Sequence, residues 1–186
     1  MTDIEPMARH YFIRLSLQYY VAGRFAALNR LHSVTPTLLH HAVELILKAA
    51  LARTHSLAEL KQQHGHGLSS LWQAAVQKKS ALKTPSRDAT IADLDKFEDL
   101  RYPDKRISQG ASVSIGIRSG ENPVSSGSHP SSGPSYRFNL GDIDELWAAV
   151  FESIPANPSA FLQGLSEDAH KALVAENQHP IARHLP

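Results

Sequence analysis

TPTLLHHAVELILKAAL, residues 35–51, is the stretch that decides the fold, because it predicts a helix that is apolar on nearly every side. Thr35 is a residue type that accepts a hydrogen bond from a free N–H of the first helical turn. Pro36 follows at a position where a missing N–H costs nothing. The apolar side chains that come next cover more than one face. Other elements enclose a helix of this kind, so we expect it at the centre of a helical bundle.

A polar stripe interrupts this helix. Glu44 and Lys48 are four residues apart with the acid first, a spacing that favours an ion pair. An unpaired buried charge is costly, so neighbouring groups must satisfy the stripe. Residues 64–67, HGHG, read as a turn that brings two more imidazoles. The stripe and the turn together predict a structural polar network of His40, His41, Glu44, Lys48, His64 and His66.

Histidines and a carboxylate are also ligand types for zinc or a similar ion. A partly buried Glu44 that is satisfied by Lys48 and a histidine of the turn explains the same residues without an ion. We therefore predict no metal and no cofactor.

The composition is that of an ordinary chain of 186 residues, with 42% hydrophobic and 20% charged residues. We expect one domain over residues 1–186. The formal net charge of +1 gives no global attraction to nucleic acid or to a membrane. The chain has no cysteine, which excludes disulfides and thiolate catalysis. No apolar run reaches the roughly 20 residues that span a bilayer, and residues 1–10 lack the apolar centre of a signal peptide, so we expect a cytoplasmic protein without membrane contact.

Apolar residues at helical spacing predict further helices on both sides of residues 35–51. The first helix is expected to place its arginines, Arg24 among them, largely on faces other than the apolar one, and Gly23 to let a neighbouring helix approach closely. Asp142 and Glu145 resemble an Asp variant of the capping box. Residues 6–106 would form the core bundle and residues 142–176 the C-terminal helices. The expected helices are 6–31, 67–79, 91–102, 142–154 and 166–176, with a loop at 84–89.

Between these helical parts the spacing of apolar residues changes from a helical period to strict alternation with polar residues. Apolar and polar residues alternate from Ala111 to Ile117 and again from Tyr136 to Leu140. Two alternating runs around a turn-rich segment predict a β-hairpin over residues 111–140. Residues 119–135 are rich in Ser, Gly, Pro and Asn, which predicts a flexible loop at the tip of that hairpin.

Four segments resemble HEPN-like proteins: QYYVAGRFAAL (18–28), LLHHAVELILKAAL (38–51), HGHGLSSLW (64–72) and FEDLRYPD (97–104). The alternating segments and NPSAFLQGL (157–165) look like an uncharacterised bacterial branch of that family. The resemblance covers residues 10–104. It implies an up-and-down helical bundle of four to five helices, often dimeric, from toxin–antitoxin, phage-defence or RNA-processing systems.

Active HEPN ribonucleases carry an arginine, four to six intervening residues and then a histidine. The arginine would stabilise phosphate charge, and the histidine would act as acid or base on the ribose hydroxyl. No pair in this chain fits. Lys61 and His66 have the spacing, but lysine lacks the bidentate guanidinium fork. The pairs with arginine at unsuitable spacing are Arg24–His32, Arg30–His32 and Arg53–His55.

We therefore predict no catalytic residues and a non-catalytic HEPN-like interaction or accessory protein, of a bacterial defence or toxin–antitoxin type system. It would act as a homodimer or bind another protein. The alternative is an RNA-directed ribonuclease with a non-standard active site. Candidate phosphate or RNA contacts are Arg101, Lys105 and Arg106, although a solvated helix end is the favoured explanation of these residues. A second basic group, which we interpret as a solvated loop, is Lys78, Lys79, Lys83 and Arg87.

Overall fold

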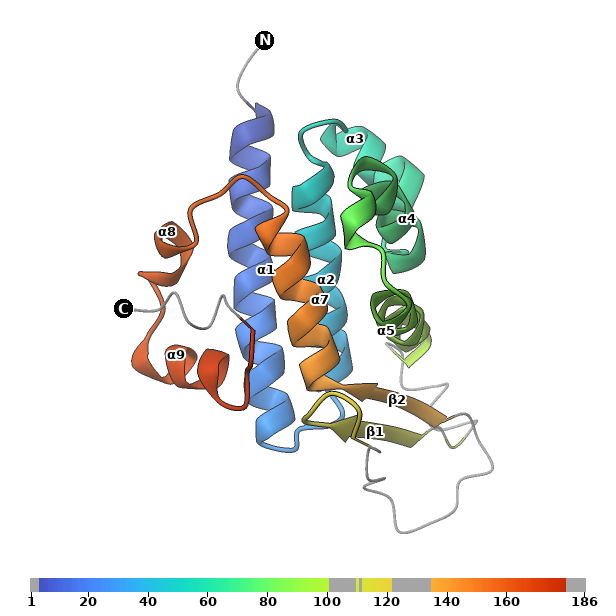
Figure 1. The fold of residues 1–186 in the computed structure, drawn as a ribbon, viewed down its shortest axis with the longest axis vertical. Helices are drawn as coiled ribbons and strands as arrows, with labels where there is room; N and C mark the ends of the chain where they lie inside the picture. The colour runs from blue at the N-terminus through green and yellow to red at the C-terminus, as the bar shows by residue number, and fades with distance from the viewer. Residues whose placement is uncertain (1–3, 101–109, 111, 122–134, 180–186) are drawn as a thin grey trace.

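The computed structural model describes residues 4–100, 110, 112–121 and 135–179 (Figure 1). The fold is mainly helical, as the sequence predicts. The α-helices are α1 (Ile4–Leu28), α2 (Thr35–Leu51), α3 (Leu57–Glu59), α4 (Leu68–Lys78), α5 (Pro85–Asp95), α7 (Leu140–Glu152), α8 (Ser159–Leu162) and α9 (Glu167–Val174). A π-helical turn (Leu60–His64) and two 3-10 segments (Ser80–Leu82 and Lys96–Leu100) lie between them.

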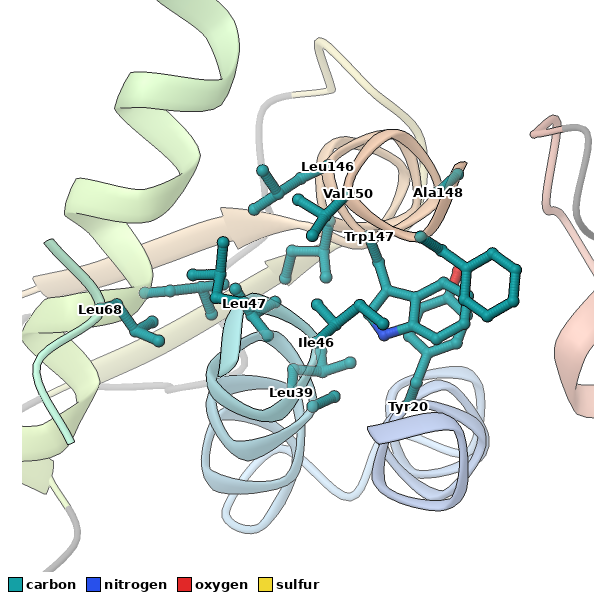
Figure 2. Close-up of a cluster of buried hydrophobic side chains, with 14 of the residues drawn as sticks. Tyr20, Leu39, Ile46, Leu47, Leu68, Leu146, Trp147, Ala148 and Val150 are labelled. Carbon is teal, nitrogen blue, oxygen red and sulfur yellow. The ribbon is translucent and has the colours of Figure 1, made fainter. Parts of the chain in front are cut away.

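Helices α1 and α2 form an antiparallel pair, and α7 crosses one face of this pair (Figure 1). Helices α4 and α5 cover a second side of α2, while α8 and α9 pack along α1. Figure 2 shows Leu39, Ile46 and Leu47 of α2 inside the apolar cluster that α7 closes with Trp147. The expectation that residues 35–51 form the enclosed central helix is therefore correct.

Helix α1 approaches α2 closely where Gly23 lies. A Cβ atom added at Gly23 would lie only 2.6 Å from Cδ2 of Leu39. Further along α1, the Tyr20 ring stacks on Trp147 of α7 with centroids 4.4 Å apart. The indole N–H of Trp147 donates to Ser16 Oγ at 2.8 Å, so this buried polar group has a hydrogen-bond partner inside the core.

The predicted cap of one helix and the predicted start of another were wrong. Helix α2 begins at Thr35 as predicted, but Thr35 Oγ1 donates to the Leu31 carbonyl at 2.9 Å instead of capping the helix. Helix α5 begins at Pro85, because Thr84 Oγ1 accepts from the Arg87 N–H at 3.2 Å. The predicted loop at 84–89 is thus mostly helical. The α-helical part of α5 ends at Asp95, well before the predicted end at residue 102.

The predicted capping box at Asp142 is also wrong. Helix α7 begins two residues earlier, directly after strand residue Asn139. Glu145 instead reaches across to α5, where Arg87 Nη2 lies 2.5 Å from its Oε1. A capping box is present elsewhere, at the start of α3, where Ser56 and Glu59 satisfy each other's backbone N–H groups. No helix was predicted at that position.

Strands β1 (Ser112–Gly116) and β2 (Ser135–Asn139) pair in parallel, so the predicted β-hairpin is wrong. Alternating polarity identifies a strand but is the same for both directions of pairing. A parallel pair needs a crossover of about a dozen residues or more, and residues 117–134 are long enough to supply one. Tyr136 and Phe138 point inward against Phe97. Of the predicted flexible loop at 119–135, residues 122–134 lie outside the described residues.

Arg24, expected largely on another face of α1, is instead fully buried. Its guanidinium pairs with Asp144 of α7, and Tyr20 donates to the same carboxylate at 2.6 Å. Arg24 Nε also donates to the Ala172 carbonyl at 2.9 Å, and its Nη2 to that of Ala175. One buried side chain therefore ties α1 to α7 and to the C-terminal end of α9.

Helix α2 provides a test of the core. Ile46 is fully buried, whereas its neighbour Leu45 is half-buried on the outer face. We expect Ile46→Ala to lower the free energy of unfolding by about 2–5 kcal/mol, because a buried side chain leaves a cavity. Leu45→Ala is the matched control and should cost clearly less. Urea denaturation followed by circular dichroism measures both, and equal losses would contradict the placement of α2.

Candidate functional site

A densely connected polar site surrounds Glu44, which is only 3% exposed. Lys48 Nζ lies 2.5 Å from Glu44 Oε1. Nδ1 of His41 lies 3.2 Å from Oε2, and Nδ1 of His66 lies 3.1 and 3.2 Å from the two carboxylate oxygens. The structure thus brings together a carboxylate from the central helix, two residues of the same helix and one residue of the turn after the π-helical segment.

Burial by itself raises the pKa of Glu44. Hydrogen bonds from His41, Lys48 and His66, together with the charge of Lys48, outweigh burial and lower that pKa to about 2. Glu44 is therefore an ionised carboxylate that only accepts hydrogen bonds.

This acceptor sets the tautomer of two histidines. Because Glu44 cannot donate, His41 and His66 must each carry a proton on Nδ1, the nitrogen that faces the carboxylate. In the neutral imidazoles, Nε2 then carries the free lone pair. The His66 side chain is 58% exposed and the His41 side chain 21%. His41 is partly covered because its ring contacts Tyr19, with centroids 5.4 Å apart.

His40 serves a structural purpose at the same site. Its buried ring lies with Nδ1 3.2 Å from the Leu94 carbonyl and Nε2 3.3 Å from the His66 carbonyl. Glu98, which was not among the predicted site residues, lies 3.6 Å from the same Nε2. His40 thus connects α2 with the end of α5 and with the turn.

The turn itself is held through its backbone. Lys48 Nζ donates to the Gly65 carbonyl at 2.8 Å, in addition to its contact with Glu44. Gly65 has a φ of +54°, a left-handed conformation that glycine adopts at little cost. The predicted turn therefore docks on α2 mainly by carbonyl groups that accept from Lys48 and contact His40.

His64 does not join the network predicted for it. Its Nδ1 lies 3.1 Å from Ser70 Oγ, and its ring faces His55 at a centroid distance of 5.9 Å. His64 Nε2 is buried without a hydrogen-bond partner in the described structure. Burial, followed by the charges of His55 and Lys48, lowers the pKa of His64. The lowered pKa favours the neutral imidazole of His64 beside the site.

The other predicted contacts fall elsewhere. Arg101, Lys105 and Arg106 lie outside the described residues. Arg87 is engaged by Glu145 and by the Leu82 carbonyl, so it does not form a free basic patch with the exposed lysines of that region. Among the described residues, no group of three or more His, Asp or Glu side chains is arranged to hold a metal ion.

A pocket of about 260 Å³ lies apart from this site, between α4 and α5. Trp72, Lys83 and Asp88 are among the residues that line it, and the Trp72 indole N–H donates to Asp88 at 2.7 Å. Ligand pockets usually enclose about 300–1,000 Å³. The pocket is smaller, and its aromatic residue is already hydrogen-bonded, so we assign no ligand to it.

No family model, curated protein or solved structure matches this chain. The HEPN-like resemblance therefore depends on the sequence segments alone. None of the helices in the described parts of the chain is both long and apolar enough to cross a membrane.

The geometry around Glu44 predicts that the free energy of unfolding depends on pH. The folded-state pKa of about 2 lies below the usual value of 4.5, so the ionised carboxylate stabilises the fold above pH 4.5, and this contribution is lost as the pH falls toward 2. The shift corresponds to roughly 3 kcal/mol. We expect Glu44→Gln to lower stability at pH 7 by a similar amount and to flatten the pH profile between 4.5 and 2.

Glu167→Gln is the matched control, because Glu167 and Lys171 form an ion pair at the same spacing on the surface of α9. Exposed pairs contribute about 0–1 kcal/mol. Urea denaturation at a series of pH values measures both variants. Equal effects of the two substitutions would show that Glu44 is not the coupled, buried group described above.

Proposed function

We propose that this protein is a non-catalytic, HEPN-like interaction protein that forms a homodimer through one face of α1. Its setting would be a bacterial defence or toxin–antitoxin type system, as the HEPN-like segments imply. The observation that carries the proposal is an exposed stripe along α1, which we call the α1 stripe. It consists of Met7, Tyr11, Arg14, Gln18, Ala22, Phe25 and Asn29.

Large apolar side chains are concentrated on this stripe. Tyr11 is 61% exposed and Phe25 51%, and Met7 is more exposed than either. Leu31 and Val34, in the turn between α1 and α2, are also exposed apolar residues. Soluble proteins rarely leave such side chains grouped on one surface unless a partner covers them. In the described part of the chain, α1 packs against α2, α7, α8 and α9, whereas the residues of the stripe are exposed.

The spacing of the stripe favours a second copy of the same chain as the partner. Its positions are symmetric about Gln18, at four, seven and eleven residues on either side. An antiparallel copy of α1 would therefore place Tyr11 opposite Phe25 and Gln18 opposite itself. This is the self-complementary contact that a twofold dimer requires. Residues 7–29 span about 33 Å of helix, long enough for an extended helix–helix contact.

Charge supports the same arrangement. Arg14 is the one charged residue of the stripe, and in the antiparallel pair it would face Ala22. The two arginines would lie two helical turns apart, about 12 Å along the axis. At physiological ionic strength this exceeds the Debye length, so their repulsion is largely screened.

The contacts around Glu44 support a non-catalytic role. Phosphoryl chemistry on RNA needs a cation fixed beside the acid–base group. Lys48 is already held by Glu44 and the Gly65 carbonyl, and Arg24 is buried in its ion pair with Asp144. No arginine contacts His41 or His66 among the described residues.

The dimer is tested by Tyr11→Glu and Phe25→Glu. Each places a charge in the proposed interface, so we expect the dissociation constant to rise by at least about tenfold, which corresponds to 1.4 kcal/mol. Leu57→Glu is the control, because Leu57 is a similarly exposed apolar residue on α3. Sedimentation equilibrium over a range of protein concentrations measures the constant. A parent protein that stays monomeric at high concentration would contradict the proposal.

The alignment of the two α1 helices, with Gln18 opposite Gln18, can be tested separately by cysteine cross-linking. The chain contains no cysteine, so an introduced thiol is the only one present. In Gln18→Cys the two thiols would meet at the symmetry axis, and mild oxidation should give a disulfide-linked dimer. Gln77→Cys, at an exposed position on α4, is the control and should not cross-link at the same protein concentration. If the glutamate variants dissociate the dimer but Gln18→Cys does not cross-link, the face is correct and the register is not.

The non-catalytic assignment predicts that the purified, tag-free protein does not cleave single-stranded or structured RNA at the rate of a HEPN toxin. The reason is that Lys48, the cation nearest the histidines around Glu44 in the described part of the chain, is already held by that carboxylate and the Gly65 carbonyl. Electrophoresis of labelled RNA measures cleavage, with His64→Ala and His66→Ala assayed in parallel. Cleavage by the parent that either variant abolishes would replace this proposal by the ribonuclease alternative.

A further inference from the structure

We propose that Nε2 of His66 is a phosphoryl-acceptor site, modified by donors that carry phosphorus on nitrogen, the phosphoramidate class. The proposal concerns modification of this chain and does not depend on dimer formation through α1. It follows from how Glu44, the turn and the solvent are arranged around one imidazole.

Glu44 fixes both the orientation and the tautomer of His66. The ring nitrogen facing the carboxylate lies 3.1 and 3.2 Å from its two oxygens and must carry the proton. The opposite nitrogen, Nε2, is left as the nucleophilic atom. A carboxylate behind an imidazole also stabilises the positive charge that forms when the outer nitrogen acquires a new bond.

The imidazole is not needed to close the turn. The backbone carbonyls of Gly65 and His66 already fix it, through contacts with Lys48 and His40. The His66 side chain projects from a segment with glycine on both sides and is 58% exposed. A ring that served packing alone would not combine this exposure with a buried, ionised carboxylate behind it.

The chemical step is a simple displacement. The Nε2 lone pair attacks phosphorus, an N–P bond to the imidazole forms, and the N–P bond of the donor breaks. Phosphoramidate at neutral pH already carries three protons on its nitrogen, so the electron pair of the broken bond leaves on that nitrogen as ammonia and no proton has to come from the protein. The Nδ1 proton stays between the ring and Glu44, and the new imidazolium charge lies next to that carboxylate. Nothing is oxidised or reduced.

In the described structure, each of four other histidines lacks either a carboxylate partner at Nδ1 or an exposed ring. His40 is buried with both nitrogens in contact with carbonyl groups. His41 has the same carboxylate but is largely covered. His64 has its Nε2 buried. His10 is exposed but contacts the Phe161 ring, and it provides an exposed histidine without a carboxylate for comparison.

The experiment treats the full chain with potassium phosphoramidate at neutral pH. Peptide mapping by mass spectrometry follows the rate at each histidine, and ³¹P NMR distinguishes Nε2 from Nδ1 phosphohistidine. We expect the first phosphoryl group on Nε2 of His66, at a rate at least about tenfold above that of His10, because His10 lacks, among the described residues, a carboxylate that fixes the tautomer and stabilises the imidazolium charge. His66→Asn should remove this product and leave modification of His10 unchanged.

Glu44→Gln should reduce the rate at His66 toward that at His10, provided circular dichroism shows a folded variant. If the variant does not fold, ¹⁵N NMR of the unmodified parent replaces it and should show the Nδ1–H tautomer of His66. Equal rates at His66 and His10, a product on Nδ1, or an Nε2–H tautomer would each overturn the proposal.

Discussion

The burial of α2 on nearly all sides is the constraint on which the rest of the structure depends. An enclosed helix gives a large apolar contact area, but it also takes Glu44 and His40 out of water. Unpaired, such groups cost several kcal/mol, so the surrounding elements must bring partners to them. The turn at residues 64–67 and the end of α5 do so with carbonyl groups and one imidazole. The polar site is therefore a consequence of placing a charged stripe on the central helix.

The same rule explains the second buried ion pair. Residues 13, 17, 20, 24 and 27 of α1 follow the spacing of an apolar seam, and Arg24 occupies one position of it. Asp144 lies likewise between Leu140, Trp147 and Phe151 on the inner face of α7. Arg24 in the α1 seam and Asp144 in the α7 seam carry opposite charges. Each of these buried charges gains its partner only when the two seams pack together. The remaining donors of Arg24 then reach the last carbonyls of α9, where positive charge is favourable.

The parts that sequence predicted well are those with strong local periodicity. Residues 35–51 form α2 as expected, and the contact of Glu44 with Lys48 follows from their spacing within one helix. The direction of the strands was not predictable, because alternation in Val113–Ile117 is the same in either orientation. The prediction for Arg24 was wrong because it considered the charge of the side chain and not its position in the apolar seam of α1. The start of α5 was missed although Thr84-Pro85 repeats the pattern of Thr35-Pro36. Glu98 joins the site only through the tertiary fold.

The α1 stripe and the outer nitrogen of His66 lie on different elements, and this separation follows from how α1 and α2 share their faces. Helix α1 packs against α2, α7 and α9 and leaves the α1 stripe exposed, whereas the polar stripe of α2 contacts the turn at residues 64–67 and the end of α5. The ring contact between Tyr19 and His41 connects α1 with the polar stripe of α2. It covers His41 rather than His66, whose side chain is 58% exposed. The proposed modification of His66 and the proposed assembly through α1 therefore rest on different elements of the fold.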